Sequence, residues 1–268
     1  MDYQAIIIIN IILTLTCIGL IFGLGLAYAE LKFGIELDPR IHEVEDVLPK
    51  GQCGACGFAG CAAYAEAVVI QQDVSPNLCI PGKTEVAKLV ACITGKEVKE
   101  IEGVKAHILC YGMPEKAFIY DGIPDCEAAN LLFGGNKTCQ YACLGMGNCL
   151  LACKFEAISM SERELPVVNT ELCSGCGQCV RACPKGIIEL IPETAKVKVR
   201  CKSLDKGPVV KKICSVGCIG CGICAKECPY EAIKLENSLA IIDHAKCITC
   251  IDYKCLPKCP TSAIVTVV

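Results

Sequence analysis

The cysteines of this chain are spaced in a way that suits iron–sulfur chemistry. Two runs share the pattern Cys-x2-Cys-x2-Cys-x3-Cys-Pro, one from Cys173 to Pro184 and the other from Cys218 to Pro229. Three thiolates this close in sequence wrap one face of a [4Fe–4S] cluster, and the fourth normally ligates the neighbouring cluster. The two runs therefore predict paired cubane clusters and a protein that conducts electrons.

Two looser groups of four cysteines accompany these runs. They are Cys139, Cys143, Cys149 and Cys153, and Cys247, Cys250, Cys255 and Cys259. Exchange of the fourth cysteine between paired clusters predicts four ligand sets. These sets are Cys139, Cys143, Cys149 with Cys183; Cys173, Cys176, Cys179 with Cys153; Cys218, Cys221, Cys224 with Cys259; and Cys247, Cys250, Cys255 with Cys228. The irregular spacing of the looser groups leaves a three-iron cluster as the lesser alternative to a cubane.

A fifth group lies nearer the N-terminus in a glycine-rich loop. It consists of Cys53, Cys56, Cys61 and, before a proline, Cys79. The intervening glycines let the backbone turn tightly around a bulky cofactor. We expect one self-contained [4Fe–4S] site here, followed by a helix over residues 62–69.

Four further cysteines precede the two ferredoxin-like segments in parallel positions. They are Cys110 and Cys126 before the first segment, and Cys201 and Cys214 before the second. Two interpretations stay open, namely a sixth cluster site built from all four and four thiols without a metal. The sequence therefore predicts at least five [4Fe–4S] clusters, with the sixth undecided.

The cysteine content also bears on other kinds of site. The chain has 26 cysteines in 268 residues, which in a short secreted chain would predict disulfides. Zinc favours paired Cys-x2-Cys or Cys/His sets, and none of the three histidines is in such a pair. The close triplets favour clusters over disulfides and zinc, and reduced thiols indicate a cytoplasmic location.

The N-terminus predicts a membrane anchor. Residues 5–29 carry no charged side chain and are long enough to cross a bilayer as a helix. No basic region precedes them, so a retained anchor is favoured over a cleaved signal peptide. Lys32 and Arg40 follow the span. This order predicts a single-pass protein of the cell membrane with its N-terminus outside and its cluster domains on the cytoplasmic face.

These features together predict an α+β fold. It comprises an N-terminal transmembrane helix, a small four-cysteine iron–sulfur domain and two ferredoxin-like, βαβ-type modules of two clusters each. The expected boundaries are 1–29 for the anchor, 30–50 for a linker, 51–82 for the iron–sulfur domain, 83–135 for a connecting region, 136–192 for the first module, 193–212 for a basic linker and 213–268 for the second module.

The charge distribution suggests one docking surface. The formal net charge is −3, and without a basic excess or interleaved aromatic residues we do not expect nucleic-acid binding. The basic linker could steer an acidic electron carrier to the clusters. Its candidate docking residues are Lys196, Lys198, Lys202 and Lys206. The alternative is a solvated strand face, since the first of these alternate with Val197 and Val199.

The whole pattern resembles a known family. A short membrane helix, the run from Gly51 to Cys61 (GQCGACGFAGC) and ferredoxin-like repeats resemble the RnfB family, the iron–sulfur subunits of Rnf complexes, over essentially the whole chain. The runs Lys137 to Cys149 (KTCQYACLGMGNC) and Gly217 to Cys221 resemble the longer form from anaerobic bacteria. The resemblance implies a complex that oxidises reduced ferredoxin, reduces NAD+ and pumps sodium ions or protons. It also implies partners: membrane subunits, flavin-binding and NADH-binding subunits, reduced ferredoxin as donor, and the lipid bilayer.

Within such a complex this chain would conduct electrons and receive the donor. It has no Gly-x-Gly-x-x-Gly after a predicted strand and no flavin signature, so hydride transfer would lie on another subunit. A membrane span without charged residues offers no path for ions, so ion pumping would also lie on other subunits. Two alternatives are the polyferredoxin arm of another membrane complex, of hydrogenase or formate dehydrogenase type, and a non-enzymatic protein that stores metal or binds zinc structurally.

Overall fold

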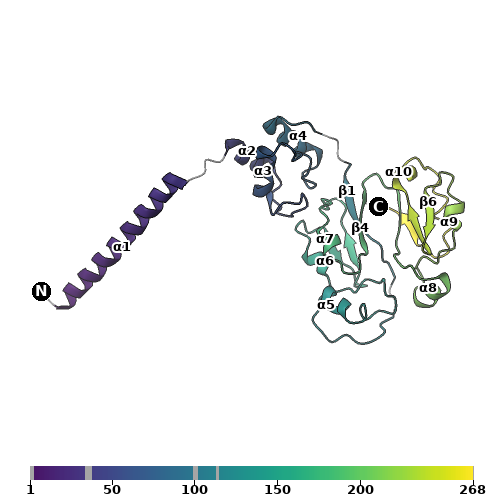
Figure 1. The fold of residues 1–268 in the computed structure, drawn as a ribbon. Coiled ribbons are helices and arrows are strands. Elements are labelled where there is room, and N and C mark those ends of the chain that lie inside the picture. Colours follow the sequence, from purple (N-terminus) through teal and green to yellow (C-terminus); the bar gives the residue numbers. More distant parts are fainter. Residues whose placement is uncertain (1–2, 34–37, 99–101, 113–114, 268) are drawn as a thin grey trace.

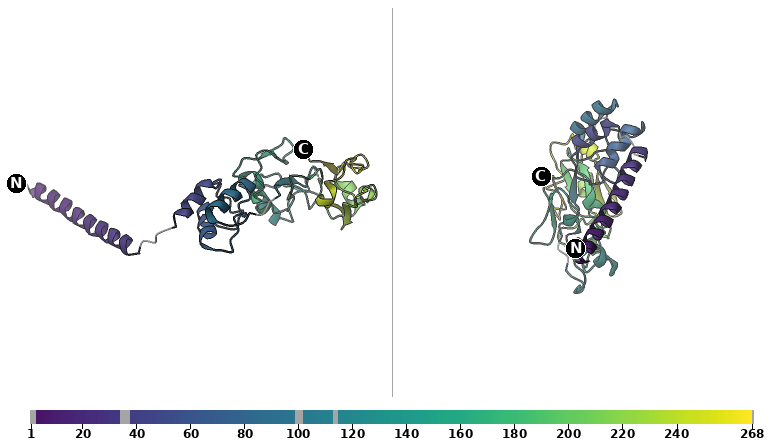
Figure 2. Two further views of the ribbon diagram at one scale, coloured as in Figure 1. Left: turned by 90° about the horizontal axis from the view of Figure 1, so that it is seen from above. Right: turned by 90° about the vertical axis from the view of Figure 1, so that its left-hand side faces the viewer.

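The computed structural model describes residues 3–33, 38–98, 102–112 and 115–267. Its first element is α1 (Tyr3–Phe33), which extends away from the rest of the chain in Figure 1 and in the left view of Figure 2. The part Ile7–Phe33 is long and apolar enough to cross a membrane, and none of its most apolar window is buried. The helix thus continues beyond residue 29, the expected end of the anchor.

The second unit is a small helical domain built from α2 (Pro39–Val47), α3 (Cys61–Ile70) and α4 (Lys83–Thr94). Asp38 caps α2, because its carboxylate accepts the backbone N–H of Arg40 at 3.0 Å. Val44, Tyr64 and Val90 are buried in one core shared by the three helices. The expected helix over 62–69 is present as α3. Residues 39–47, expected inside a linker, instead form a helix whose apolar face covers this core.

The next unit contains two antiparallel strand pairs. β1 (Val104–Ile108) pairs with β4 (Ile188–Pro192), and β2 (Ile158–Met160) pairs with β3 (Pro166–Val168). Three short helices lie between the strands, namely α5 (Cys126–Leu131), α6 (Asn148–Leu151) and α7 (Gln178–Arg181). Because these helices and strands are short, most of the unit consists of the loops that carry the cysteines.

The last unit repeats the same plan. β5 (Val197–Val199) pairs with β8 (Ile264–Thr266), and β6 (Ile233–Glu236) pairs with β7 (Leu239–Ile242), again antiparallel. Its helices are α8 (Gly207–Ile213), α9 (Ile223–Lys226) and α10 (His244–Cys247). In each unit the first strand pairs with the last and the two middle strands pair with each other, so the chain contains an internal repeat.

This pairing differs from the expected modules in two respects. All four strand pairs among the described residues are antiparallel, so the structure has no parallel βαβ crossover there. β1 falls in the segment expected to connect domains, and β5 falls in the expected basic linker. The closing strand of each module needs a partner for its backbone N–H and C=O groups, and the partner comes from the chain before the cysteine loops.

The units follow one another in space as they do in sequence. Figure 1 shows α1, then α2 to α4, then the β1–β4 unit, then the β6–β7 unit. The Gln178 side chain donates to the carbonyl oxygen of Cys53, which ties the helical domain to the first module. Lys198 Nζ of β5 lies 2.7 Å from His107 Nδ1 of β1, which ties the two modules together. The cysteine groups are therefore strung along one path.

Candidate metal centres

The helical domain brings its four predicted ligands together. Cys53, Cys56 and Cys61 line the loop into α3, and Cys79 comes from the turn before α4. Burial raises the pKa of the Cys79 thiol to about 11; the nearby thiols of the other three add to this, while the Gly82 backbone opposes it. Gln52 Oε1 accepts the backbone N–H of Cys61 at 2.9 Å and so holds the loop closed.

One crossover set of the first module lines a single cavity. Its thiols belong to Cys153, Cys173, Cys176 and Cys179. Burial, together with smaller contributions from the thiols of Cys173, Cys176, Cys149 and Cys153, raises the pKa of Cys179 to about 12. Gly177, which precedes α7, has φ of 75°, a conformation that only glycine adopts without strain. The structure thus brings Cys153 beside the three cysteines of the neighbouring loop; that they ligate one cluster stays a prediction.

Both predicted sets of the second module are also assembled. Burial raises the pKa of Cys224 to about 11, and the neighbouring thiols of Cys218, Cys221 and Cys259 contribute. Burial likewise raises the pKa of Cys247 to about 11, with contributions from Cys250, Cys255 and Cys228. In each set three thiols come from one loop and the fourth from the other, so the two sites interlock.

The remaining set of the first module differs from the expectation. Burial raises the pKa of Cys143 to about 12 and that of Cys149 to about 11. The thiol of Cys126 contributes to both, after Cys110 and Cys149 for Cys143 and after Cys183 for Cys149. The thiol of Cys183 also raises the pKa of Cys149. The backbone N–H of Cys126 donates to Asn148 Oδ1 at 2.8 Å, which fixes α5 beside α6. Cys126 thus lies where the spacing placed Cys139.

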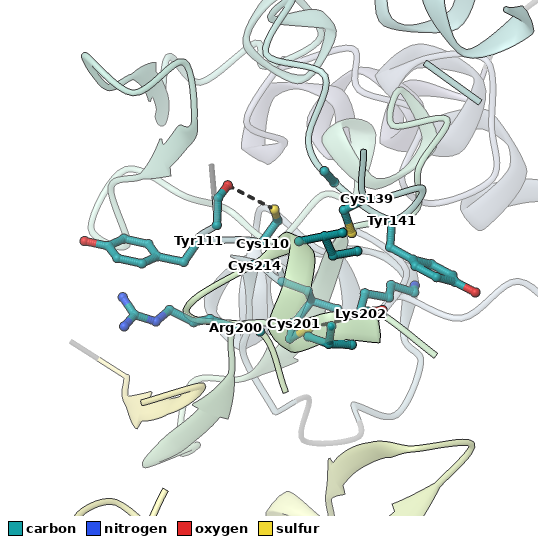
Figure 3. A pocket seen from close by; sticks show the side chains of 15 residues that line it. Cys110, Tyr111, Cys139, Tyr141, Arg200, Cys201, Lys202 and Cys214 are labelled. Atoms are coloured by element: carbon teal, nitrogen blue, oxygen red, sulfur yellow. Dashed lines mark hydrogen bonds between the residues drawn. The ribbon is translucent and has the colours of Figure 1, made fainter. Parts of the chain in front are cut away.

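Cys139 belongs to a different group. It lines a cavity together with Cys110, Cys201 and Cys214. Figure 3 shows these four side chains around one space, with Tyr111 and Arg200 on one side and Tyr141 and Lys202 on the other. Burial raises the pKa of Cys139 to about 11, and the strongest thiol contributions come from the same three cysteines. The sequence offered one signal, the irregular spacing between Cys139 and Cys143.

Two cysteines lie outside these groups. Cys17 is exposed on α1, and Cys92 is exposed on α4. Neither shares a loop or a cavity with the residues above, so neither is a candidate ligand.

The cysteine groups fit iron–sulfur clusters because backbone N–H groups donate hydrogen bonds to their sulfur atoms. The N–H of Ala157 lies 3.3 Å from Cys153 Sγ, and the N–H of Ala263 lies 3.3 Å from Cys259 Sγ. Although burial raises the pKa of Cys259, backbone N–H groups bring it below its usual value. Hydrogen bonds to the sulfur atoms stabilise the thiolate and help to set the reduction potential of a cluster.

The described residues contain no group of three or more Cys, His, Asp or Glu side chains gathered tightly enough for a single metal ion.

The four candidate docking lysines divide into two kinds. Lys196, Lys202 and Lys206 are exposed, although Lys202 Nζ also donates to the carbonyl oxygen of Gly186. Lys198 is turned inward to His107 at 2.7 Å, and burial lowers its pKa. Lys198 on β5 thus lies in the junction between the two modules, whereas Lys196, Lys202 and Lys206 lie at the surface.

Comparisons with known proteins agree with this geometry. Residues 48–81 match the family described as "Putative Fe-S cluster", residues 166–189 the "4Fe-4S binding domain" and residues 217–264 the "4Fe-4S dicluster domain". The chain thus combines an iron–sulfur domain with two ferredoxin-type 4Fe–4S regions.

Full-length relatives extend the comparison. The B subunit of the "Proton-translocating ferredoxin:NAD(+) oxidoreductase complex" of Clostridium ljungdahlii is 54% identical over 97% of this chain and 93% of its own length. The B subunit of the "Na(+)-translocating ferredoxin:NAD(+) oxidoreductase complex" of Acetobacterium woodii is 44% identical over 92% and 74%. That of the "Ion-translocating oxidoreductase complex" of Methanosarcina acetivorans is 43% identical over 96% and 98%. The chain therefore belongs to the RnfB family, the B subunits of ion-translocating ferredoxin:NAD(+) oxidoreductase (Rnf) complexes.

Proposed function

We propose that this chain is the iron–sulfur electron-transfer subunit of a membrane-bound ferredoxin:NAD+ oxidoreductase that translocates sodium ions or protons. It accepts electrons from reduced ferredoxin and relays them to flavin-bearing and membrane subunits. The observation that carries the proposal is the row of cysteine groups from the membrane-side domain to the far module. A bound [4Fe–4S] cluster exchanges one electron at a time, so such a row conducts without bond-making chemistry.

The proposed ligands follow the observed groups. Five [4Fe–4S] clusters would be held by Cys53, Cys56, Cys61 and Cys79; by Cys153, Cys173, Cys176 and Cys179; by Cys126, Cys143, Cys149 and Cys183; by Cys218, Cys221, Cys224 and Cys259; and by Cys228, Cys247, Cys250 and Cys255. The matching domain boundaries are residues 39–94 for the helical iron–sulfur domain, 104–192 for the first module and 197–266 for the second.

The proposed direction of flow is from the second module toward the membrane. The helical iron–sulfur domain follows α1 along the chain, while the second module lies at the other end of the row. Lys32 and Arg40 at the C-terminal side of the span favour a cytoplasmic position for the cluster domains. A soluble donor would therefore meet the second module first, and the helical domain would deliver electrons to membrane partners.

The proposed docking surface lies on the second module, along β5 and α8 and beside the junction with the first module. Lys196, Lys202 and Lys206 are exposed around β5 and the start of α8, and Lys211 and Lys212 are exposed in the last turn of α8. An acidic ferredoxin would be steered by such a surface, and its approach would weaken with added salt.

A genetic test addresses the whole proposal. Membrane vesicles from cells lacking this chain should lose NAD+ reduction driven by reduced ferredoxin, and the full chain supplied in trans should restore it. A double variant with Cys173→Ala and Cys176→Ala should fail to restore it, while Cys92→Ala, at an exposed and ungrouped cysteine, should restore it fully. Undiminished NAD+ reduction without the chain would refute the proposal.

A further inference from the structure

Within the proposed electron relay, we propose that Cys110, Cys139, Cys201 and Cys214 hold a sixth [4Fe–4S] cluster that joins the two ferredoxin-like modules. The four residues come from separate places in the fold. Cys110 follows β1, Cys139 lies in the loop before α6, Cys201 follows β5, and Cys214 ends α8. Two are thus supplied by each module, and together they line one cavity between them (Figure 3).

The backbone around this cavity leaves room for sulfur. A Cβ atom added to Gly112 would overlap Cys214 Sγ. A Cβ on Gly217 would lie 3.5 Å from the same sulfur and 2.5 Å from Val210 Cγ1. Neither glycine has a positive φ, so glycine is needed at these positions for room and not for backbone conformation. At Gly112 that room is what lets the Cys214 sulfur reach the cavity.

The sulfur atoms of this group receive the same backbone support as those of the other groups. The N–H of Cys143 lies 3.5 Å from Cys110 Sγ, and the N–H of Ser203 lies 3.5 Å from Cys201 Sγ. In the crossover site of the first module, the N–H of Ala157 serves Cys153 Sγ in the same way. N–H groups directed at sulfur favour the thiolate that iron requires.

Cationic side chains also border the cavity. Arg200 and Lys202 contribute to its lining, and the Arg200 guanidinium carbon lies 3.7 Å from the centre of the Tyr111 ring. Four thiolates bring more negative charge than the iron and sulfide core neutralises, so positive neighbours stabilise the assembled site.

The group is in contact with a cluster site on each side. Cys143, a ligand proposed for the first module, donates its N–H to Cys110 Sγ. On the other side, the backbone of Cys218, a ligand proposed for the second module, lies near enough to the Cys201 thiol to lower its pKa against the effect of burial. One electron entering from the second module would leave as one electron to the first, with no bond or proton exchanged. The sixth cluster would thus bridge the junction between the two modules.

Iron and acid-labile sulfide per chain, measured on anaerobically purified full-length protein, test the inference. The expected wild-type content is about twenty-four irons, against about twenty for five clusters. About twenty irons would overturn the sixth site and leave the proposed relay standing. Very little iron would overturn both the sixth site and the relay.

Pairs of alanine substitutions test which cysteines share the site. Cys139→Ala with Cys201→Ala should remove about four irons in total, because both changes fall on one cluster. Cys126→Ala with Cys201→Ala should remove about eight, because they fall on two. Cys92→Ala should remove none. The reverse result, about eight for the first pair and about four for the second, would place Cys126 in the sixth site and overturn the assignment of Cys139.

A spectroscopic readout covers the case in which a variant folds poorly. During reduction with dithionite, the EPR spectrum of the wild-type chain should contain a cubane signal that is absent from Cys139→Ser and retained in Cys92→Ser. The remaining signals serve as an internal check that the variant has folded. If all cubane signals persist in a folded Cys139→Ser variant, the inference is wrong.

Discussion

The backbone N–H of Cys143 lies 3.5 Å from Cys110 Sγ, so two cysteine groups touch through one hydrogen bond. Cys143 belongs to the group with Cys149 and Cys183, whereas Cys110 faces the second module. A hydrogen bond to a ligating sulfur also influences the potential of the cluster it serves. The two neighbouring sites are therefore coupled in structure as well as in sequence.

Gly112→Ala should empty the junction site selectively. The new methyl group would overlap Cys214 Sγ, and this sulfur would have to leave its position. We expect a loss of about four irons per chain, with the other clusters retained. Iron and sulfide analysis with EPR measures this. Gly23→Ala is the control, because nothing lies within 4 Å of its added Cβ. A Gly112→Ala chain with the full wild-type iron content would contradict the role given to this glycine.

Removal of residues 1–33 should release the chain from the membrane without emptying its clusters. Ile7–Phe33 is the described segment long and apolar enough to span a bilayer, and the helical domain forms its core without it. When the chain is expressed without its partners, the full form should sediment with membranes and the shortened form should stay in the supernatant. Both should carry equal iron. Sedimentation of the shortened form with membranes would show that another part of the chain anchors it.

Replacing the exposed lysines of the second module should slow electron uptake from ferredoxin. With Lys196, Lys202 and Lys206 all changed to glutamine, we expect a roughly tenfold lower second-order rate at low salt and a flatter dependence on ionic strength. Stopped-flow mixing with reduced ferredoxin gives both quantities. Lys88→Gln, at an exposed position on α4 in the helical domain, is the matched control and should behave as wild type. An unchanged rate and salt slope in the triple variant would end the docking hypothesis.

The junction between modules should weaken in mild acid. His107 is buried, and burial together with the charges of Lys198 and His244 lowers its pKa to about 4. Because the folded-state pKa lies below the usual 6.5, the neutral ring contributes stability above pH 6.5 that is lost as the pH falls toward about 4. The loss should be on the order of 1 kcal/mol per pH unit in that window.

Denaturant unfolding of the holoprotein between pH 5 and 7, under anaerobic conditions, measures this effect. His107→Gln keeps a polar side chain but has no proton to gain, so its free energy of unfolding should depend less steeply on pH. Comparison of the two proteins at each pH separates the histidine from the acid sensitivity that the clusters share. Parallel pH profiles would show that His107 does not titrate in this window.

Much of the site is predictable from the sequence because it depends on local spacing. The run from Cys173 to Cys183 fixes three thiols on one loop, and the repeat makes Cys153 the natural fourth ligand beside them. The partner of β1 is different, because β4 lies far along the chain and only folding of the whole module brings them together. The cysteine spacing therefore predicts that the modules begin at residues 136 and 213, whereas their first strands, β1 and β5, begin earlier, at Val104 and Val197.

The division of labour between Cys126 and Cys139 could not be predicted from spacing. Cys139 is close to Cys143 in sequence, yet it turns toward Cys201 and Cys214 of the second module. Asn148 accepts the backbone N–H of Cys126 and so holds Cys126 near Cys143 and Cys149, where Cys139 was expected. In the same way, the alternation along β5 does not reveal that Lys198 faces His107 rather than solvent. Both outcomes depend on how two modules meet, which no single motif encodes.

Electron uptake by the isolated, fully loaded chain tests its role as an electron relay most directly. Anaerobic stopped-flow mixing with reduced ferredoxin, followed through the visible absorbance of the clusters, reports the transfer itself. We predict bleaching of the chain's own absorbance at a rate proportional to ferredoxin concentration, to the extent reached with dithionite. A chain that dithionite reduces but reduced ferredoxin leaves oxidised would contradict this role.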